Sequence, residues 1–232
     1  MNAFNTHPSR LLSTMALAVG MAALALPVQA QIAQWNFNAG NTTPSIGSGT
    51  ASLVGGTTAT FASGSGSTDP TQPGFGWNTS SYPTQGTNEK TAGVRFNVST
   101  LGLSQVRVSW DQRLSNTAAN TAQFQFSTNG TTFTDFGTAF VGSPGDTWFT
   151  GRSIDLTGIA AVNNNANFAF RIVSAFGSPG NYVPATSTST YGTGGTWRFD
   201  MVSVTAVPEP GTYALLLVGV AAVGWVARRR QG

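Results

Sequence analysis

The stretch at residues 104–114, SQVRVSWDQRL, decides the fold class. Val106, Val108 and Trp110 alternate with polar or charged side chains along it. Such alternation has the two-residue period of a β-strand, in which successive side chains point to opposite faces. We therefore predict a strand that packs one apolar face against a core and turns its polar face outward.

The same alternation recurs along most of the chain, between segments rich in Gly, Ser and Asn. With shorter pieces near Leu53 and Phe61 it predicts roughly eight to ten strands, while helical periodicity is scarce. The other main runs are residues 32–38, 92–98, 122–136, 147–157, 167–173 and 196–206.

Two of these runs carry more detailed predictions. Asn129-Gly130 lies between two apolar runs and predicts a hairpin, because both residues tolerate the positive φ of a tight turn. In the last run the alternation assigns Met201 to the same face as the large aromatic side chains. It assigns Val202 and Val204 to the opposite face.

The strands are expected to form an all-β, antiparallel β-sandwich, jelly-roll-like in topology, over residues 31–206. The first and last runs fit terminal strands that pair near each other. Residues 40–91 are less regular, and 62–86 is predicted to be a long loop because of its neutral Gly, Ser and Pro content. The order of the segments resembles that of jelly-roll carbohydrate-binding modules, which implies a similarity of fold.

Charged side chains are scarce, at 8% of the chain against about 25% in typical soluble domains. Residues 31–206 carry seven basic and seven acidic side chains, so the formal charge of +3 comes from the two ends. A nucleic-acid-binding surface needs a basic patch or stripe that meets the phosphate backbone. Nucleic acid is therefore not an expected partner.

The chain has no Cys, and its one His is His7, near the N-terminus. A Cys nucleophile, a Ser-His-Asp triad and a zinc or copper site on nitrogen or sulfur ligands are therefore excluded for the domain. Carboxylates remain as candidate catalytic groups, and calcium remains as a candidate metal. No other cofactor is expected.

Residues 1–30 have the three parts of a secretory signal peptide. A positive region ending in Arg10 precedes an apolar stretch at 11–26, and small residues stand before Gln31. We predict export by the Sec machinery and cleavage between Ala30 and Gln31. An uncleaved anchor helix is the alternative, although Pro27 directly follows the apolar stretch.

A second apolar run, residues 211–227, ends at three arginines, Arg228, Arg229 and Arg230. As a helix this run would be roughly 25 Å long, which just spans a hydrocarbon core. The arginines follow the positive-inside tendency, so a transmembrane helix with its C-terminus in the cytoplasm is predicted. A buried core helix is the alternative, but no charged residue interrupts the run to give it a polar face.

Val207, Pro208, Glu209 and Pro210 stand just before the apolar run. Pro-Glu-Pro, an apolar segment and an arginine cluster at the C-terminus together resemble the PEP-CTERM sorting signal of Gram-negative bacteria that produce exopolysaccharide. The resemblance covers residues 207–232. It implies recognition by an exosortase, a membrane transpeptidase-like enzyme, with cleavage near the box and delivery to the envelope or matrix.

The prolines give the box a physical role without reference to any family. They cannot continue a helix and they favour a stiff, extended segment, which we expect to be solvent-accessible for binding in an enzyme cleft.

Trp77 and Tyr82 lie within the predicted loop. Aromatic rings in a Gly-rich loop can stack on sugar rings, or they can cover the edge of their own core. Both interpretations remain open, so these two residues are the candidates for a polysaccharide site.

The carboxylates of the domain are scattered along the chain. No pair has a spacing that guarantees the approach of roughly 5–10 Å that a glycoside hydrolase needs, so catalysis is not expected. The candidates are Asp111, Asp135, Asp146, Asp155 and Asp200.

A calcium site follows only from the resemblance to jelly-roll binding modules. In such modules an Asp on the closing strand often ligates calcium together with backbone carbonyls of the opening strand. By that resemblance Asp200 is a candidate calcium ligand, with Asn36 or Asn38 near it. An ion pair of Asp200 with a neighbouring Arg is the alternative.

The sequence thus predicts an exported, exosortase-processed and non-enzymatic protein of the cell surface or exopolysaccharide matrix. It would first be tethered in the inner membrane with its domain outside the cytoplasm. A carbohydrate-binding module is the first alternative, and a carboxylate-dependent glycoside hydrolase is the second.

Overall fold

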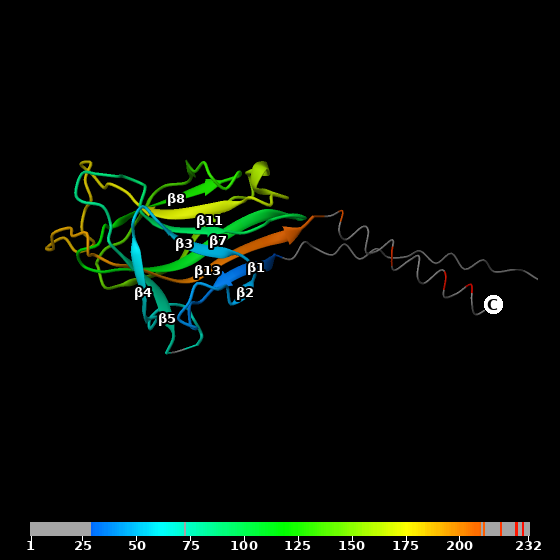
Figure 1. Cartoon of the computed structure of the whole chain (residues 1–232), viewed down its shortest axis with the longest axis horizontal. Coiled ribbons are helices and arrows are strands. Elements are labelled where there is room, and N and C mark those ends of the chain that lie inside the picture. The colour runs from blue at the N-terminus through cyan, green and yellow to red at the C-terminus, as the bar shows by residue number, and fades with distance from the viewer. Residues whose placement is uncertain are drawn as a thin grey trace, which may run out of the picture.

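The computed structural model describes residues 29–71 and 73–209, together with the single tail residues Gly211, Gly219, Val226 and Arg229. The described residues form two antiparallel sheets that pack as a β-sandwich (Figure 1). The prediction of an all-β, antiparallel sandwich is confirmed.

The first sheet has seven strands in the order β11-β7-β13-β1-β2, with β5 also paired to β13 and β4 paired to β5. The central strands β7 and β13 are the longest, and they include the predicted runs at 104–114 and 197–206. The bounds are β1 Ala30–Trp35, β2 Ile46–Gly47, β4 Thr58–Ser63, β5 Phe75–Ser80, β7 Leu103–Leu114, β11 Trp148–Asp155 and β13 Trp197–Pro208.

The second sheet has six strands in the order β10-β8-β12-β6-β3, with β9 paired to β8. One turn of 3₁₀ helix, Ala160–Val162, lies between β11 and β12. The bounds are β3 Thr50–Val54, β6 Gly93–Asn97, β8 Thr121–Ser127, β9 Thr134–Asp135, β10 Phe140–Val141 and β12 Ala169–Ser174.

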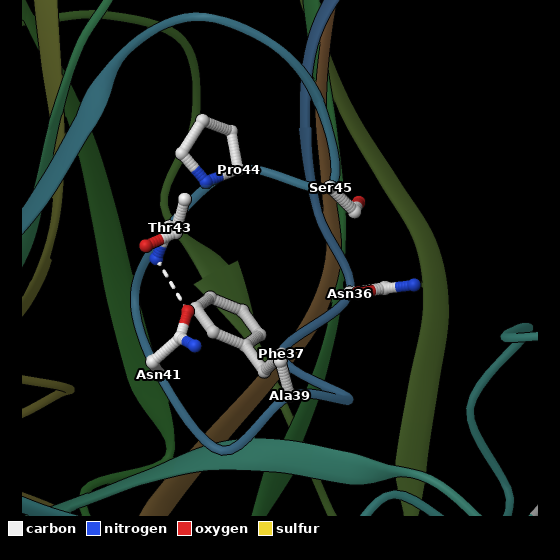
Figure 2. A pocket seen from close by; sticks show the side chains of 7 residues that line it. All are labelled: Asn36, Phe37, Ala39, Asn41, Thr43, Pro44 and Ser45. Carbon is white, nitrogen blue, oxygen red and sulfur yellow. Dashed lines mark hydrogen bonds between the residues drawn. The ribbon is translucent and has the colours of Figure 1, made fainter.

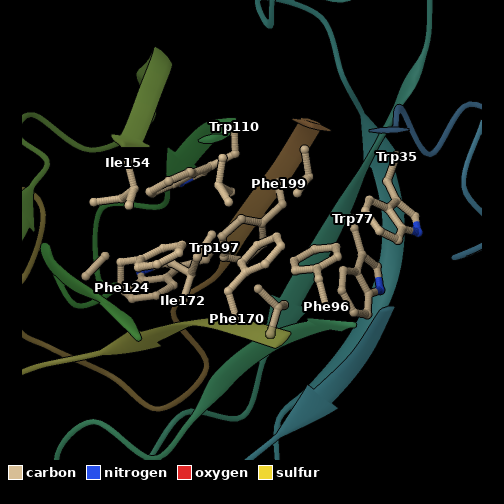
Figure 3. Close-up of a cluster of buried hydrophobic side chains, with 14 of the residues drawn as sticks. Trp35, Trp77, Phe96, Trp110, Phe124, Ile154, Phe170, Ile172, Trp197 and Phe199 are labelled. Carbon is tan, nitrogen blue, oxygen red and sulfur yellow. The ribbon is translucent and has the colours of Figure 1, made fainter. Parts of the chain in front are cut away.

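Large aromatic side chains fill the space between the two sheets (Figure 3). Trp35 of the first sheet contacts Phe96 of the second, with ring centroids 4.9 Å apart, and Phe96 stacks on Phe170 at 5.0 Å. Phe124 continues the series and stacks on Trp110 of the first sheet at 6.0 Å. Aromatic pairs at such distances add to the free energy gained by burying the rings.

The first and last strands pair with each other, as predicted. Ala30 at the start of β1 lies opposite Ala206 near the end of β13, and Trp35 lies opposite Val202. The attachment points of the N-terminal leader and of the C-terminal tail are therefore neighbours at one end of the sandwich (Figure 1).

The predicted alternation in the last run is wrong after Asp200. The register shifts between Asp200 and Ser203, and Met201 has a φ of 47°. A β-bulge of this kind adds one residue to a strand and reverses which face the following side chains occupy. Val202 and Val204 are therefore fully buried, while Met201 is only partly buried.

The predicted loop at 62–86 is also partly wrong. Phe75–Ser80 forms β5, which pairs with β4 on one side and with β13 on the other. Its alternation was hidden by small and polar residues, and the true loop is the stretch between β4 and β5. The hairpin at Asn129-Gly130 is confirmed by the pairing of β8 with β9, but only Gly130 of the two has a positive φ.

The predicted signal peptide core and most of the apolar run at 211–227 lie outside the described residues. Within the part of the chain that the structure describes, no helix has the length and apolar character needed to cross a membrane.

Candidate functional site

The sorting box begins inside the last strand of the first sheet. Val207 pairs with Ser104 and Pro208 pairs with Leu103, both of β7, and the backbone N–H of Glu209 donates to the Gly102 carbonyl at 3.0 Å. The strand ends here because Pro208 has no N–H to continue the ladder.

The start of the box is extended, as predicted, but it is largely covered by the domain and not exposed to solvent. Val207 is only 3% exposed, and Pro208 and Glu209 are half-buried. The predicted solvent accessibility is therefore wrong for this part, because the apolar alternation of β13 runs on into the box. Pro210, Arg228 and Arg230 lie outside the described residues, whereas Arg229 is described as a single residue.

The predicted cleavage point lies at the start of β1. Ala30 pairs with Ala206 and Gln31 with Thr205, so cleavage between Ala30 and Gln31 would remove only the first residue of the strand. The rest of β1, from Gln31 to Trp35, would keep its pairing with β13. Cleavage at this bond remains a prediction.

Asp200 lies on β13 directly opposite Asp111 of β7, and both carboxylates are buried, at 0% and 2% exposure. The loop between β4 and β5 covers them. Ser67 Oγ donates to Asp200 Oδ2 at 2.6 Å, and the N–H of Thr68 donates to Asp111 Oδ2 at 2.6 Å. The sequence pattern did not reveal this pair. Asp111 and Asp200 lie 89 positions apart in the chain, and the register between two such distant strands cannot be read from a sequence.

Burial is the main cause that raises the pKa of Asp200 to about 7, and the nearby charges of Asp69 and Asp111 add to it. Hydrogen bonds from Ser67 and from the Met201 N–H oppose this shift. A carboxyl group with a raised pKa beside a second carboxyl group is an arrangement found in acid–base catalysis. Here both groups are covered by protein, so a substrate has no access to them.

Protein groups donate hydrogen bonds to Asp200, the predicted calcium ligand, and to Asp111. Calcium binding at Asp200 remains a prediction. All four oxygens already accept a hydrogen bond, since Met201 N–H donates to Asp200 Oδ1 and Gly151 N–H donates to Asp111 Oδ1, both at 2.8 Å. Asn38 instead donates to Asp69 at 2.6 Å. In the described part of the chain no group of three or more His, Cys, Asp and Glu residues could hold a metal ion.

The remaining candidate carboxylates are engaged in ion pairs on the surface. Each has a cation within 3 Å, which is the ordinary arrangement of a solvated ion pair. The pairs are Lys90–Asp135 at 2.7 Å, Arg113–Asp146 at 2.7 Å and Arg107–Asp155 at 2.9 Å.

Trp77 and Tyr82 are both core residues. Trp77 is 3% exposed and stacks on Phe37 at 5.5 Å, while Tyr82 is 4% exposed and shares a hydrogen bond of 2.6 Å with Thr79. Of the two interpretations of these rings, the structure supports the one in which they cover their own core. Little of either ring is therefore exposed for a sugar to stack on.

Two hollows lie on the surface near the β1–β2 connection. The smaller, of about 210 Å³, is lined by that connection, where the Thr43 N–H donates to Asn41 Oδ1 at 2.9 Å (Figure 2). The larger, of about 440 Å³, is open and lies between β3 and β4, with Trp77 and Phe61 on its border. Neither hollow is lined by a charged side chain.

Some solved structures are similar to this chain at low identity. The CBM22-1 xylan-binding domain of Paenibacillus barcinonensis Xyn10C is 10% identical with a TM-score of 0.47, over 80% of this chain and 99% of that one. The CBM22-1-GH10 modules of Clostridium thermocellum xylanase 10B are 12% identical with a TM-score of 0.45, over 76% of this chain and 28% of that one.

A third structure, domain 4 of the Geobacillus stearothermophilus arabinanase AbnA, is 13% identical with a TM-score of 0.38, over 79% of this chain and 96% of that one. No curated protein sequence matches the chain.

The family model of the PEP-CTERM protein-sorting motif matches residues 206–231. The match begins at Ala206, the residue that pairs with Ala30, and takes in the box and the arginine cluster. The sequence resemblance is thereby confirmed, and the chain is a protein with a C-terminal PEP-CTERM sorting motif.

Proposed function

We propose that this chain is an exported protein that an exosortase-type membrane enzyme recognises and cuts near the Pro-Glu-Pro box. The mature domain then acts, without catalysis, at the cell surface or in the exopolysaccharide matrix. The observation that carries the proposal is the sorting motif at residues 206–231, attached directly to the closing strand of a β-sandwich.

In this proposal the three segments of the chain have separate roles. Residues 1–30 direct Sec export and are removed, 31–206 form a jelly-roll-like domain, and 207–232 form the sorting signal. The apolar run at 211–227 holds the box at the membrane, and the three arginines keep the C-terminus in the cytoplasm.

The end of β13 presents the box in a form that an enzyme cleft can bind. Val207 and Pro208 already have the extended backbone that proteases and transpeptidases accept. To enter a cleft they must leave β7, which costs the pairs with Ser104 and Leu103 and the Glu209 hydrogen bond. Strand ends open locally at a small fraction of the global unfolding free energy, so this step is feasible.

A non-enzymatic role is supported by the state of the carboxylates. Asp135, Asp146 and Asp155 are ion-paired. Asp111 and Asp200 are covered and hydrogen-bonded. The neutral, hydroxyl-rich surface suits a component that is packed among hydrated polysaccharides.

The test is to isolate the protein from cells with and without the sorting enzyme and to read both termini by mass spectrometry. We expect the wild-type product to begin at Gln31 and to lack Arg228, Arg229 and Arg230. Cells without the enzyme should keep the arginines on a membrane-bound form.

A matched pair of variants assigns the effect to the box. Pro208→Ala combined with Glu209→Ala should block processing, whereas Pro70→Ala in the exposed β4–β5 loop should leave it unchanged. Arg230 found in the wild-type extracellular product would contradict the proposal.

A further inference from the structure

The outer face of the second sheet carries a row of polar side chains that crosses five strands. Arg171 of β12 lies opposite Arg95 of β6 on one side and opposite Gln125 of β8 on the other. The row extends to Asp135 of β9 and to Ser52 of β3. Residues at successive cross-strand positions on one face are side by side, so these five side chains form a continuous polar strip.

Positive charge gathers at the centre of this strip. Arg95 and Arg171 are direct cross-strand neighbours, and like charges in that position are destabilising. Asp135 is the nearest acidic member of the row, but it already pairs with Lys90 at 2.7 Å and accepts from Gln125 Nε2 at 2.8 Å. Within the described residues, Arg95 and Arg171 thus lie together and neither forms an ion pair, although the charge of Asp135 acts on Arg171 from a longer distance.

Protein contacts hold the two guanidinium groups in place. Arg95 donates to Asn97 Oδ1 at 2.9 and 2.7 Å and to the Gly130 carbonyl at 2.6 Å. The Phe133 ring lies against both arginines, with its centroid 3.8 Å from the Arg171 Cζ and 5.2 Å from the Arg95 Cζ. Such cation–π contacts fix the orientation of a guanidinium without using its N–H donors.

The donors of Arg171 are left without partners. Among the hydrogen bonds and ion pairs of the described residues, none involves this guanidinium, and its Nε is buried and unpaired. The Oε1 atom of Gln125, its cross-strand neighbour, is likewise buried and unpaired. Unpaired buried donors and acceptors are rare in proteins because each costs free energy, so the polar groups at this point of the strip are not fully satisfied by the protein itself.

We propose that Arg95, Arg171 and Phe133 form a binding site for a carboxylate-bearing polysaccharide, that is, a chain containing uronic acid residues. The inference rests on the proposed function, which places the domain among exopolysaccharides, and names the chemical class it would bind.

The chemistry of the strip matches this class of ligand. A guanidinium binds a carboxylate through two parallel N–H···O bonds, and a sugar ring can pack on the edge of Phe133. Ser52 is exposed, flanks Arg95 along the row and can bond sugar hydroxyls. A polyphosphate backbone is a poorer fit, since it requires a longer basic stripe than two arginines.

The experiment measures binding of the protein, purified from whole cells, to polygalacturonate and to its fully methyl-esterified form. The two probes share a backbone and differ in charge. We expect binding to polygalacturonate that weakens with added salt, and at least about tenfold weaker binding to the ester.

Three variants locate the site. Arg171→Gln should weaken binding to polygalacturonate by about tenfold or more, because both the charge and the fork of donors are lost. Arg171→Lys keeps the charge without the planar fork and should bind with an affinity between those of the wild type and Arg171→Gln. Arg107→Gln removes the same charge from the first sheet, where Arg107 pairs with Asp155, and should leave binding unchanged.

Thermal unfolding checks that each variant is folded. If Arg171→Gln does not fold, the binding measured for Arg171→Lys tests the inference instead. Equal binding to the acid and the ester, absence of binding to polygalacturonate, or an equal loss in Arg107→Gln would overturn the inference. The proposed function is tested separately by the termini and location of the product, so either proposal can fail while the other holds.

Discussion

At the scale of single residues, the buried carboxyl group of Asp200 makes folding stability depend on pH. Its pKa is raised from 3.8 to about 7, chiefly by burial. At a pH between these two values, Asp200 is therefore protonated in the folded state and ionised in the unfolded state. Folding stability should therefore fall as pH rises from about 4 to about 7, because the unfolded state binds fewer protons there.

Asp200→Asn removes this ionisation while keeping the shape of the side chain. We expect the stability of the variant, relative to wild type, to increase from pH 5 to pH 8 in urea unfolding. Asp155→Asn is the control, because hydrogen bonds from Thr157 and the charge of Arg107 lower the pKa of Asp155. The change in the relative stability of this variant with pH should be small and of opposite sign. If the difference in unfolding free energy between Asp200→Asn and the wild type is constant from pH 5 to pH 8, then Asp200 is ionised in the folded state over that whole range.

Trp77 gives a second prediction at the residue scale. Its ring is 3% exposed, stacks on Phe37 and meets Phe96 edge-on at 6.1 Å. Trp77→Ala should lower the free energy of unfolding by about 3–5 kcal/mol, measured by urea unfolding. Phe75→Ala on the same strand, at 45% exposure, should cost much less. Equal losses in the two variants would show that Trp77 is not a core anchor.

At the scale of elements, the end of β13 decides how readily the sorting box opens. Leu103 pairs with Pro208 and packs against the core, whereas Leu101, two residues before it, is 59% exposed. Leu103→Asp should speed hydrogen exchange of the Glu209 amide by about tenfold, because it weakens the pairing without altering the box. Leu101→Asp should leave the rate unchanged.

Hydrogen exchange followed by mass spectrometry or NMR measures this effect, with the Val204 amide in the middle of β13 as an internal reference. If Glu209 exchanges as fast in the wild type as in an unfolded peptide, the box is not held by β7 in solution.

The elements show what the sequence could predict. Strands with large alternating apolar residues, such as 104–114, were predicted because their period depends on local residues alone. The bulge at Met201 was missed because a bulge leaves no mark on the alternation before it. β5 was missed because tertiary pairing with β13, and not local propensity, makes it a strand.

The candidate sites also differ in whether the sequence could predict them. The sorting motif is a contiguous segment, so its residues could be named from sequence. The Asp111–Asp200 pair and the Arg95–Arg171 pair depend on cross-strand register, which joins residues distant in the chain. Single-sequence reasoning has no access to such register, and therefore neither pair was predicted.

At the scale of the whole molecule, the two ends of the domain stabilise each other. β1 and β13 lie side by side within the first sheet, and β13 also pairs with β7 and β5. The leader and the sorting tail are thus attached to the two strands that close the sandwich. Processing at either end must spare these strands if the mature domain is to stay folded.

This requirement limits where the tail can be cut. A chain ending at Glu209 keeps all of β13, so its thermal unfolding should match that of the full chain. A chain ending at Met201 loses Val202, Val204 and Ala206, all fully buried, and with them the pairing of β1.

The loss is large compared with the stability of a domain. Two buried valines alone contribute about 3–6 kcal/mol, against a total of roughly 5–15 kcal/mol for a typical domain. We expect the chain ending at Met201 to show no cooperative unfolding by circular dichroism. If it unfolds cooperatively at the same temperature as the full chain, then β13 does not restrict the cleavage site. If it shows no cooperative unfolding, the mature protein must extend beyond Met201, which excludes cleavage of the tail at or before that residue.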